Sequence, residues 1–270
     1  MSQYHQLKQD VEEQQDEELR REQFGMENDD DNTTSEMIDN DSNTLASDTN
    51  LDIDFSTPRV VLCIGKPKKG KSNAIKYWIL KNTIDKRIWQ FGIVFSKTGL
   101  FPWEYTYVPK KFVYPDYEEH ILQEYINSLK QCINRYGQAP PNFVIFDDLL
   151  GLLNKHDKFL LNFLAIHRHL GCTVFFAFQH LNFGTSTTMR EICSHGIFFS
   201  SKSTNTLESI YKNFGTLFSN YRQFKRVFHD ITKEDYHGML YIQDEDDVAK
   251  NYLDFKAPDM SGVKHKIIYT

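Results

Sequence analysis

Residues 60–80 leave few folds open to this chain, because a strand, a glycine-bounded loop and a helix are predicted there in succession. The run Val60–Ile64 is apolar and rich in β-branched residues, as in a buried strand. Gly65–Ser72 reads GKPKKGKS, which fits the pattern G-x-x-x-x-G-K-[ST]. Apolar residues then recur at helical spacing from Ala74 to Ile79. This order predicts a phosphate-binding loop, and the alternative is a chance match in a turn rich in glycine and lysine.

The loop pattern has a physical basis in the way that backbone N–H groups bind phosphate. Glycines at both ends let the backbone turn these groups inward, and the following helix adds the positive end of its dipole. Lys71 is predicted to reach the β- and γ-phosphates of a nucleoside triphosphate, and Ser72 to hold Mg²⁺. The residues predicted to contact the nucleotide are Gly65, Lys66, Pro67, Lys68, Lys69, Gly70, Lys71, Ser72 and Asn73.

Short apolar runs alternate with helical segments from Arg59 onward, which is typical of an α/β fold with a mostly parallel sheet flanked by helices. Strands are predicted at 60–64, 88–96, 112–114, 142–148, 172–179, 196–200 and, as the last strand, 238–243. Helices are predicted directly after the loop and at 117–136, 156–170, 189–194, 204–214 and 218–229. We therefore expect one P-loop domain at 58–245, followed by a polar C-terminal extension at 246–270.

Charge is segregated along the chain, although the formal net charge is only −6. Before Arg59 there are 17 acidic and three basic residues, whereas 20 acidic and 28 basic residues follow from that position. Residues 1–57 hold few large apolar side chains, so they are predicted to form an acidic, disordered tail. The basic remainder indicates a polyanionic partner, with an ordinary soluble surface as the open alternative.

Two acidic residues, Asp147 and Asp148, end the apolar run Phe143–Phe146. Ligands of open α/β sheets bind at the carboxyl ends of the strands, so this run matches a Walker B strand downstream of the loop. Asp147 is predicted to hold Mg²⁺ opposite Ser72, and Asp148 to act as the general base for the attacking water. The alternative is that the strand simply ends in a turn residue.

Gln179 and Arg168 complete the predicted catalytic set with Lys71 and Asp148. Gln179 lies at the tip of the strand predicted at 172–179, where it is expected to touch the γ-phosphate or the attacking water; otherwise it faces solvent. Arg168 has three interpretations: an arginine finger toward a neighbouring subunit's nucleotide, a cap on its own helix, or a nucleic-acid contact.

Basic and aromatic residues alternate in the C-terminal third of the chain, which suits binding to the backbone and bases of nucleic acid. The alternative is the solvated face of a helix that packs its aromatic side chains inward. The residues concerned are Lys202, Tyr211, Lys212, Tyr221, Arg222, Phe224, Lys225 and Arg226.

The four cysteines are scattered and have no metal-ligand spacing. Cys63 and Cys172 fall in predicted strands and are expected to be buried and reduced, which favours an intracellular location. The N-terminus has no secretory signal, and no apolar run approaches the length needed to span a bilayer.

The order of these motifs resembles the FtsK–HerA superfamily of DNA-pumping ATPases, and within it the poxvirus-type packaging ATPases of large DNA viruses and related mobile elements. The resemblance covers residues 59–243. It rests on GKPKKGKS at 65–72, FVIFDD at 143–148, HRHLGCTVFFAFQ at 167–179 and GIFFSSKSTN at 196–205. Asp148 stands where glutamate is more common in the superfamily, so its shorter side chain must lie closer to the attacking water to act as the base.

The resemblance implies a RecA-like core that binds ATP and Mg²⁺ and assembles into a hexameric ring around double-stranded DNA. It also implies that ATP hydrolysis drives viral DNA into a preformed capsid, with a capsid or portal-vertex protein as partner. The expected location is the infected cell's cytoplasm or nucleus, and the virion. Two other functions stay open: a small-molecule or nucleoside kinase, in which the aromatic segment 99–114 shapes a pocket, and a slow nucleotide-switch scaffold.

Overall fold

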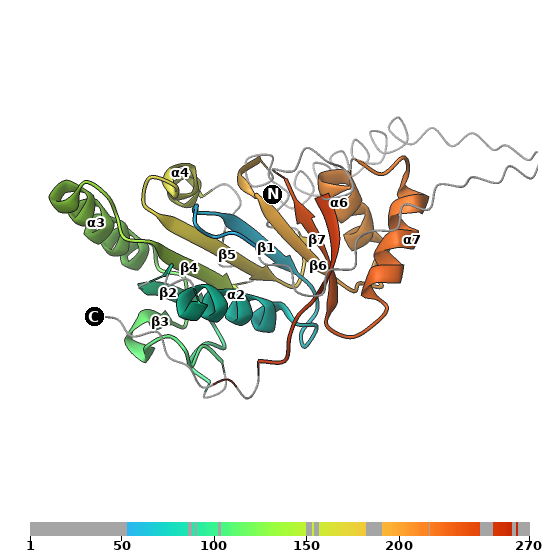
Figure 1. Ribbon diagram of the computed structural model, residues 1–270, viewed down its shortest axis with the longest axis horizontal. Helices are drawn as coiled ribbons and strands as arrows, with labels where there is room; N and C mark the ends of the chain where they lie inside the picture. The colour runs from blue at the N-terminus through green and yellow to red at the C-terminus, as the bar shows by residue number, and fades with distance from the viewer. Residues whose placement is uncertain are drawn as a thin grey trace, which may run out of the picture. The chain divides into compact units, whose positions relative to one another are not determined.

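A mixed sheet of eight strands forms the centre of the computed structural model, in the order β3-β2-β4-β5-β1-β6-β7-β8 (Figure 1). The described residues are 53–85, 88–89, 91–101, 104–149, 153, 157–181, 191–215, 217–243, 251–260 and 263. The predicted disordered tail lies outside them up to residue 52, as do residues 189 and 190 of the short helix predicted at 189–194.

The sheet joins six mutually parallel strands to an antiparallel pair at one end, because β7 runs antiparallel to β6 and β8 antiparallel to β7. This confirms the predicted α/β fold with a mostly parallel sheet. The strands are β1 (Val60–Ile64), β2 (Phe91–Ser96), β3 (Val113–Tyr114), β4 (Asn142–Asp147), β5 (Cys172–Phe178), β6 (His195–Phe199), β7 (His237–Ile242) and β8 (Tyr252–Lys256). The helices are α2 (Lys71–Asp85), α3 (Glu119–Tyr136), α4 (Lys158–Ile166), α6 (Thr204–Phe214) and α7 (Tyr221–Thr232), with a 3-10 turn at Lys110–Phe112.

Each face of the sheet has its own apolar core, because neighbouring residues of a strand point to opposite faces. In β1, Leu62 joins the core that α3, α4, α6 and α7 cover, whereas Cys63 joins the core beneath α2. The apolar positions of α2 that periodicity singled out are fully buried in this second core. The parallel strands are buried on both faces, which explains why they read as continuous apolar runs.

Several predicted boundaries differ from the observed ones, each for a local reason. The helix predicted at 156–170 ends at Ile166, and the Nδ1 of His167 then donates to the carbonyl of Cys172 at 2.8 Å. The helix predicted at 218–229 begins later, because the side chain of Asn220 caps it by accepting from the backbone N–H of Gln223. The buried Cys63 and Cys172 are free thiols, as expected.

The prediction that 238–243 is the last strand was wrong, because β8 follows within the segment expected to be a polar extension. β8 pairs along its whole length with β7, and Phe255 is buried against Trp78 of α2 with ring centroids 5.1 Å apart. The run Tyr252–Lys256 is short, and Asp254 interrupts its three apolar residues, so it does not stand out as a strand in the sequence.

The ordered domain also begins before the predicted boundary at residue 58. Ile53 and Phe55 are 3% and 1% exposed, although they were assigned to the tail. The Phe55 ring lies 5.1 Å from Trp89, 5.8 Å from Phe175 and 6.1 Å from Trp78, measured between centroids. These few apolar residues were overlooked because an acidic composition surrounds them.

Replacing Phe55 by alanine is expected to lower the free energy of unfolding by about 3–5 kcal/mol, the usual cost of deleting a buried aromatic ring. The matched control is Thr57→Ala, at an exposed position, which is expected to change stability by no more than about 0.5 kcal/mol. Denaturant unfolding measures both. Equal, small effects of the two variants would show that the domain begins later.

Candidate functional site

The loop between β1 and α2 has the backbone conformation that its glycines were expected to allow. Lys68 and Gly70 adopt positive φ angles of 62° and 112°. The N–H of Gly65 donates to the carbonyl of Phe178 at 3.1 Å, which ties the loop's first residue to the end of β5. A Cβ atom at Gly70 would lie 3.0 Å from Ala257, so both conformation and space require glycine there.

Lys71 lies at the start of α2 with its ammonium folded back onto the loop. Its Nζ donates to the carbonyls of Gly65 at 2.6 Å and Lys66 at 3.0 Å. Burial lowers the pKa of this ammonium, and the nearby Asp147 carboxylate opposes that effect. This electrostatic interaction means that the loop lysine lies near the acid at the end of β4.

Asp147 is the last residue of β4, and its carboxylate is almost completely buried. Its Oδ2 accepts from the hydroxyl of Tyr105 at 2.7 Å and, at 3.4 Å, from that of Ser96. Burial raises the pKa of Asp147 to about 6, although the Tyr105 hydrogen bond and the Lys71 charge both lower it. A buried acid held by donors in this way is a candidate ligand for a cation.

Asp148 and Gln179 contact each other directly, a pairing that the sequence did not predict. The Nε2 of Gln179 donates to Oδ1 of Asp148 at 2.8 Å. Asp148 leaves the strand with a φ of 52°, a left-handed conformation that aspartate tolerates better than most residues, while its N–H still donates to the carbonyl of Ala177. The amide therefore orients the carboxylate predicted to be the general base.

The sheet itself brings these residues to one edge. β4, β5 and β1 are adjacent and parallel, with Asp147 opposite Ala177 and Phe178 opposite Ile64. The strand ends thus place the paired acids, Gln179 and the loop at the same edge. This is the arrangement expected for a triphosphate cradle that faces two strand tips.

The segment between β2 and β3 supplies two residues of the site that sequence reasoning missed, Glu104 and Tyr105. Tyr105 is 4% exposed and reaches Asp147, as described above. Burial raises the pKa of Glu104, and the charges of Lys76 and Lys71 oppose that effect. An acid and a tyrosine in a loop rich in aromatics carry no motif, so only the fold shows where they lie.

Arg168 lies at the opposite edge of the sheet, in the turn between α4 and β5. Its carbonyl accepts from the N–H of Gly171 just before β5 begins, and its exposed side chain lines a hollow of about 280 Å³ with Gly137 and Pro141. The structure therefore does not bring Arg168 to the site of its own chain. A role as an arginine finger would therefore need the nucleotide of a neighbouring subunit. The adjacent residue, His167, is buried, and this burial lowers its pKa.

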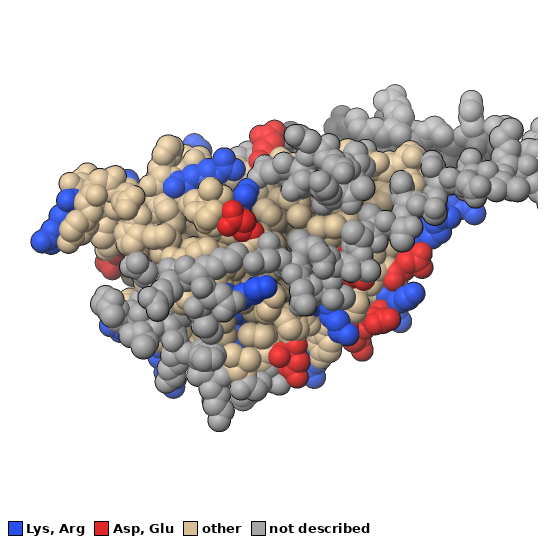
Figure 2. Space-filling view, viewed as in Figure 1, with Lys and Arg blue, Asp and Glu red and all other residues tan. Residues whose placement is uncertain are grey.

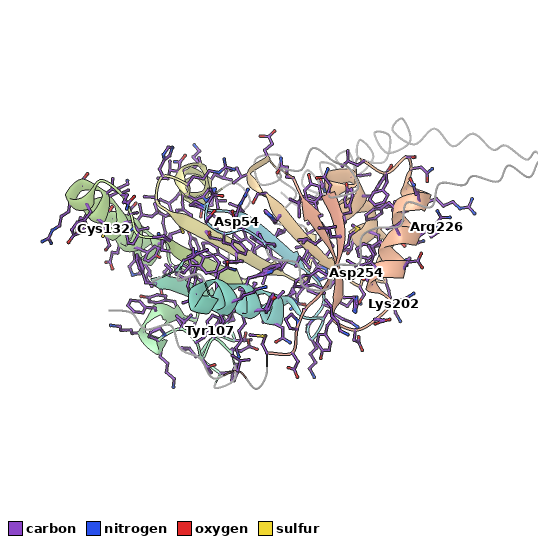
Figure 3. All side chains as sticks on the ribbon, viewed as in Figure 1. Asp54, Tyr107, Cys132, Lys202, Arg226 and Asp254 are labelled. Atoms are coloured by element: carbon purple, nitrogen blue, oxygen red, sulfur yellow. The ribbon has the colours of Figure 1, made fainter. Side chains whose placement is uncertain are left out.

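The basic helices near the C-terminus present their cations to solvent and pack their aromatic rings together. The Tyr211 ring lies 5.5 Å from both Tyr221 and Phe224, and Phe224 is fully buried. Arg226 lies on the outer side of α7 (Figure 3). Acidic side chains interrupt the basic ones around this helix (Figure 2). The aromatic residues thus follow the packed alternative, while the cations stay accessible to a polyanion.

The fold and the loop geometry together define a P-loop NTPase core, with a Walker A loop after β1 and a Walker B strand at β4. The oxygen donors fit Mg²⁺: Asp147 offers a carboxylate, and Ser72 offers a hydroxyl in the first turn of α2. Within the described ranges, no group of three His, Cys, Asp or Glu side chains is arranged to hold a metal alone. Mg²⁺ that binds with a nucleotide needs only one or two protein oxygens, because phosphates and water complete its shell.

No protein-family model matches the chain, and no curated protein matches it in sequence. The fold is nevertheless found in solved structures. One is the genome packaging NTPase B204 from Sulfolobus turreted icosahedral virus 2, in complex with AMPPCP, which is 16% identical in sequence. The superposition has a TM-score of 0.52 and covers 75% of this chain and 98% of that chain.

Two further structures come from larger proteins. The pCW3 conjugation coupling protein TcpA is 14% identical with a TM-score of 0.57, covering 79% of this chain and 64% of that one. The cytoplasmic domain of the type VII secretion ATPase EccC from Thermomonospora curvata is 18% identical with a TM-score of 0.53, covering 75% and 26%. At these identities the likeness shows the fold alone, and it confirms the expected α/β fold with a RecA-like core.

No helix in the described part of the chain combines the length and apolar character needed to cross a membrane.

Replacing Tyr105 by phenylalanine is expected to destabilise the nucleotide-free and metal-free protein by about 1–3 kcal/mol at pH 8, because a buried carboxylate loses a donor. The hydroxyl stabilises the ionised form of Asp147, whose pKa is about 6 and would rise in the variant. The difference from the wild type is therefore full above both pKa values and shrinks as the pH falls from the variant's raised pKa to about 6.

Chemical unfolding at pH 8 and pH 5 measures this difference. Tyr136→Phe, at an exposed position on α3, is the matched control and is expected to be neutral at both pH values. A Tyr105→Phe effect that does not depend on pH would contradict the coupling to Asp147.

Proposed function

We propose that this protein is an ATP-hydrolysing DNA translocase that packages viral double-stranded DNA into a preformed capsid. The observation that carries the proposal is the convergence of Lys71, Asp147 and the Asp148–Gln179 pair at the carboxyl edge of β1, β4 and β5. The fold shared with a genome packaging NTPase supports the choice of DNA as cargo.

The proposed mechanism assigns each step to a residue of this edge. The loop's N–H groups and Lys71 bind the phosphates, and Ser72 and Asp147 hold Mg²⁺. When bound there, Mg²⁺ would neutralise negative charge on the phosphate oxygens. Asp148 accepts the proton of the attacking water, while Gln179 keeps the carboxylate oriented and contacts the water or the γ-phosphate.

The rest of the proposal concerns assembly and location. We infer a homo-oligomeric, hexameric ring around duplex DNA, because Arg168 lies at the edge opposite its own nucleotide site and would act only on a neighbour's. The exposed cations of α7 are the candidate DNA contacts. A capsid or portal-vertex protein is the proposed further partner, in the infected cell's cytoplasm or nucleus and in the virion. Electron microscopy with an ATP analogue and duplex DNA tests this part: a threaded ring is expected.

A small-molecule or nucleoside kinase is the second candidate function, and one observation favours it. The segment between β2 and β3 encloses a mainly apolar hollow of about 300 Å³ that Tyr105, Leu100 and Val113 line. Since Tyr105 also binds Asp147, an acceptor molecule in this hollow would lie near the predicted γ-phosphate. DNA distinguishes the two functions: linear duplex DNA is expected to raise the ATP turnover of a translocase and to leave a kinase unchanged.

Replacing Lys71 by alanine is expected to abolish binding of ATP, because the buried ammonium is the main cation in the site. Lys130→Ala, at an exposed position on α3, is the charge-matched control and is expected to bind normally. Isothermal calorimetry measures both. Normal affinity in Lys71→Ala would show that the loop does not bind the triphosphate.

Replacing Asp148 by asparagine is expected to preserve ATP binding and to lower turnover by about 10²- to 10⁴-fold, the usual contribution of a general base. Asparagine keeps an oxygen to accept from Gln179 but cannot take a proton. Steady-state phosphate release with saturating duplex DNA measures turnover. If turnover survives, the base lies elsewhere, and Glu104 becomes the next acid to replace.

A further inference from the structure

A tyrosine lies against the phosphate-binding loop on the side away from the catalytic residues. Tyr236, in the turn between α7 and β7, is 44% exposed, one of few exposed aromatic side chains in the described part of the chain. A Cβ atom at Gly70 would lie 3.3 Å from Cδ1 of this ring, so the ring is next to the loop's last glycine. Tyr236 directly precedes β7, at the same edge of the sheet as the loop.

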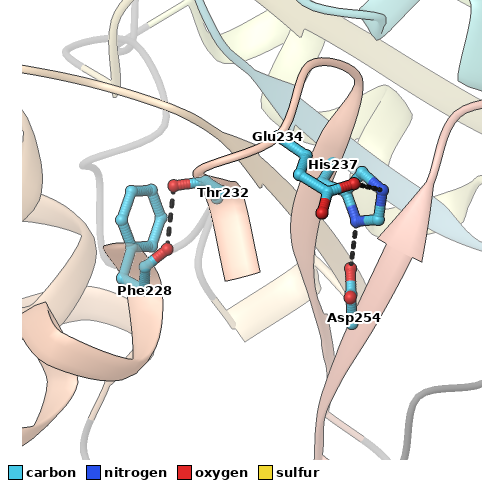
Figure 4. Close-up of polar contacts among 5 residues, drawn as sticks. All are labelled: Phe228, Thr232, Glu234, His237 and Asp254. Atoms are coloured by element: carbon cyan, nitrogen blue, oxygen red, sulfur yellow. Dashed lines mark hydrogen bonds and ion pairs between the residues drawn. The ribbon is translucent and has the colours of Figure 1, made fainter. Parts of the chain in front are cut away.

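Four contacts hold this turn in place. The ammonium of Lys69, within the loop, pairs with Asp235 at 2.8 Å, and the N–H of Ala257 donates to the carbonyl of Tyr236 at 2.9 Å. His237 pairs through Nδ1 with Asp254 at 2.9 Å, and its Nε2 lies 3.4 Å from the Glu234 carboxylate (Figure 4). Contacts on both sides of Tyr236 therefore fix its backbone beside the loop.

The backbone of Tyr236 is also unusual, because its φ is 67°. A bulky residue in the left-handed region is a genuine outlier, and such a conformation persists only where the surroundings impose it. Glycine or asparagine would fit the turn with less strain. An exposed aromatic ring held at a cost in stability calls for a purpose other than packing.

The order of the strands shows which end of a bound nucleotide would reach this ring. The γ-phosphate must face Asp148 and Gln179, at the tips of β4 and β5, and the loop lies at β1. The nucleoside must then extend from the loop toward the other side of β1, where β6 and β7 lie. From β5 to β7 there are three strand spacings, about 14 Å at ~4.8 Å each, which is the scale of an extended nucleoside triphosphate.

We propose that Tyr236 binds the nucleoside's base by stacking its ring on it, and this inference rests on the proposed nucleotide-binding function. Every base has a π-face, so the ring contributes affinity and little discrimination between ATP and GTP. The loss of the ring is expected to weaken both nucleotides alike. Inorganic tripolyphosphate has no base, so its binding depends on the loop alone.

The test compares Tyr236→Gly, Tyr236→Asn and Tyr236→Phe with the wild type in calorimetric titrations with Mg²⁺ and ATP, GTP or tripolyphosphate. Glycine and asparagine are expected to bind both nucleotides about 5- to 100-fold more weakly, to leave tripolyphosphate affinity unchanged, and to keep or raise the melting temperature. Phenylalanine keeps the stacking face and is expected to bind as the wild type. Tyr136→Ala, an exposed tyrosine on α3, is the control.

Other outcomes overturn the inference. Equal weakening of ATP and tripolyphosphate would show that Tyr236 only supports the loop, and unchanged ATP affinity would show that the base lies elsewhere. Loss of duplex DNA binding with unchanged ATP affinity would assign the ring to DNA. A wild-type protein that binds neither ATP nor tripolyphosphate would overturn the proposed function itself, and this inference with it.

Discussion

Parallel pairing of β4, β5 and β1 is the constraint on which the site depends. Parallel neighbours all end at the same edge, so a loop after residue 64, two acids after residue 146 and an amide at residue 179 meet although they are far apart in the sequence. The hydrogen bond between the N–H of Gly65 and the carbonyl of Phe178 continues this pairing into the loop. Without the strand register, the same side chains would have no common site.

The site combines groups that are costly to bury with contacts that reduce the cost. The carboxylate of Asp147 and the ammonium of Lys71 are both largely removed from water, which shifts each pKa toward the neutral form. Their mutual attraction and the Tyr105 hydroxyl oppose these shifts. Such a pair contributes little to folding stability, but it leaves charged groups ready for a polyphosphate and its cation.

The strands on the two sides of β1 place different residues near the loop. On the β4 side lie the acids, the amide and the β2–β3 segment that covers Asp147. On the β6–β8 side, Phe199, Ala257 and Tyr236 lie against Gly70, and Lys69 is bound to Asp235. The antiparallel pair β7–β8 therefore does more than end the sheet, because its turns position residues beside the loop. One of these turns directly follows α7, the helix whose cations are exposed.

The sequence by itself determined the fold class, the loop and the acid pair, because buried parallel strands read as apolar runs and glycine spacing is needed locally to turn the loop. It could not show β8 or the buried Phe55, whose few apolar side chains are surrounded by polar ones. Only the tertiary structure decided that Tyr105 contacts Asp147, that Gln179 contacts Asp148, that Tyr236 lies beside Gly70, and that Arg168 is at the opposite edge. Those contacts join segments that are distant in the sequence. The order and direction of the strands decide which segments meet, and no local sequence pattern encodes that order.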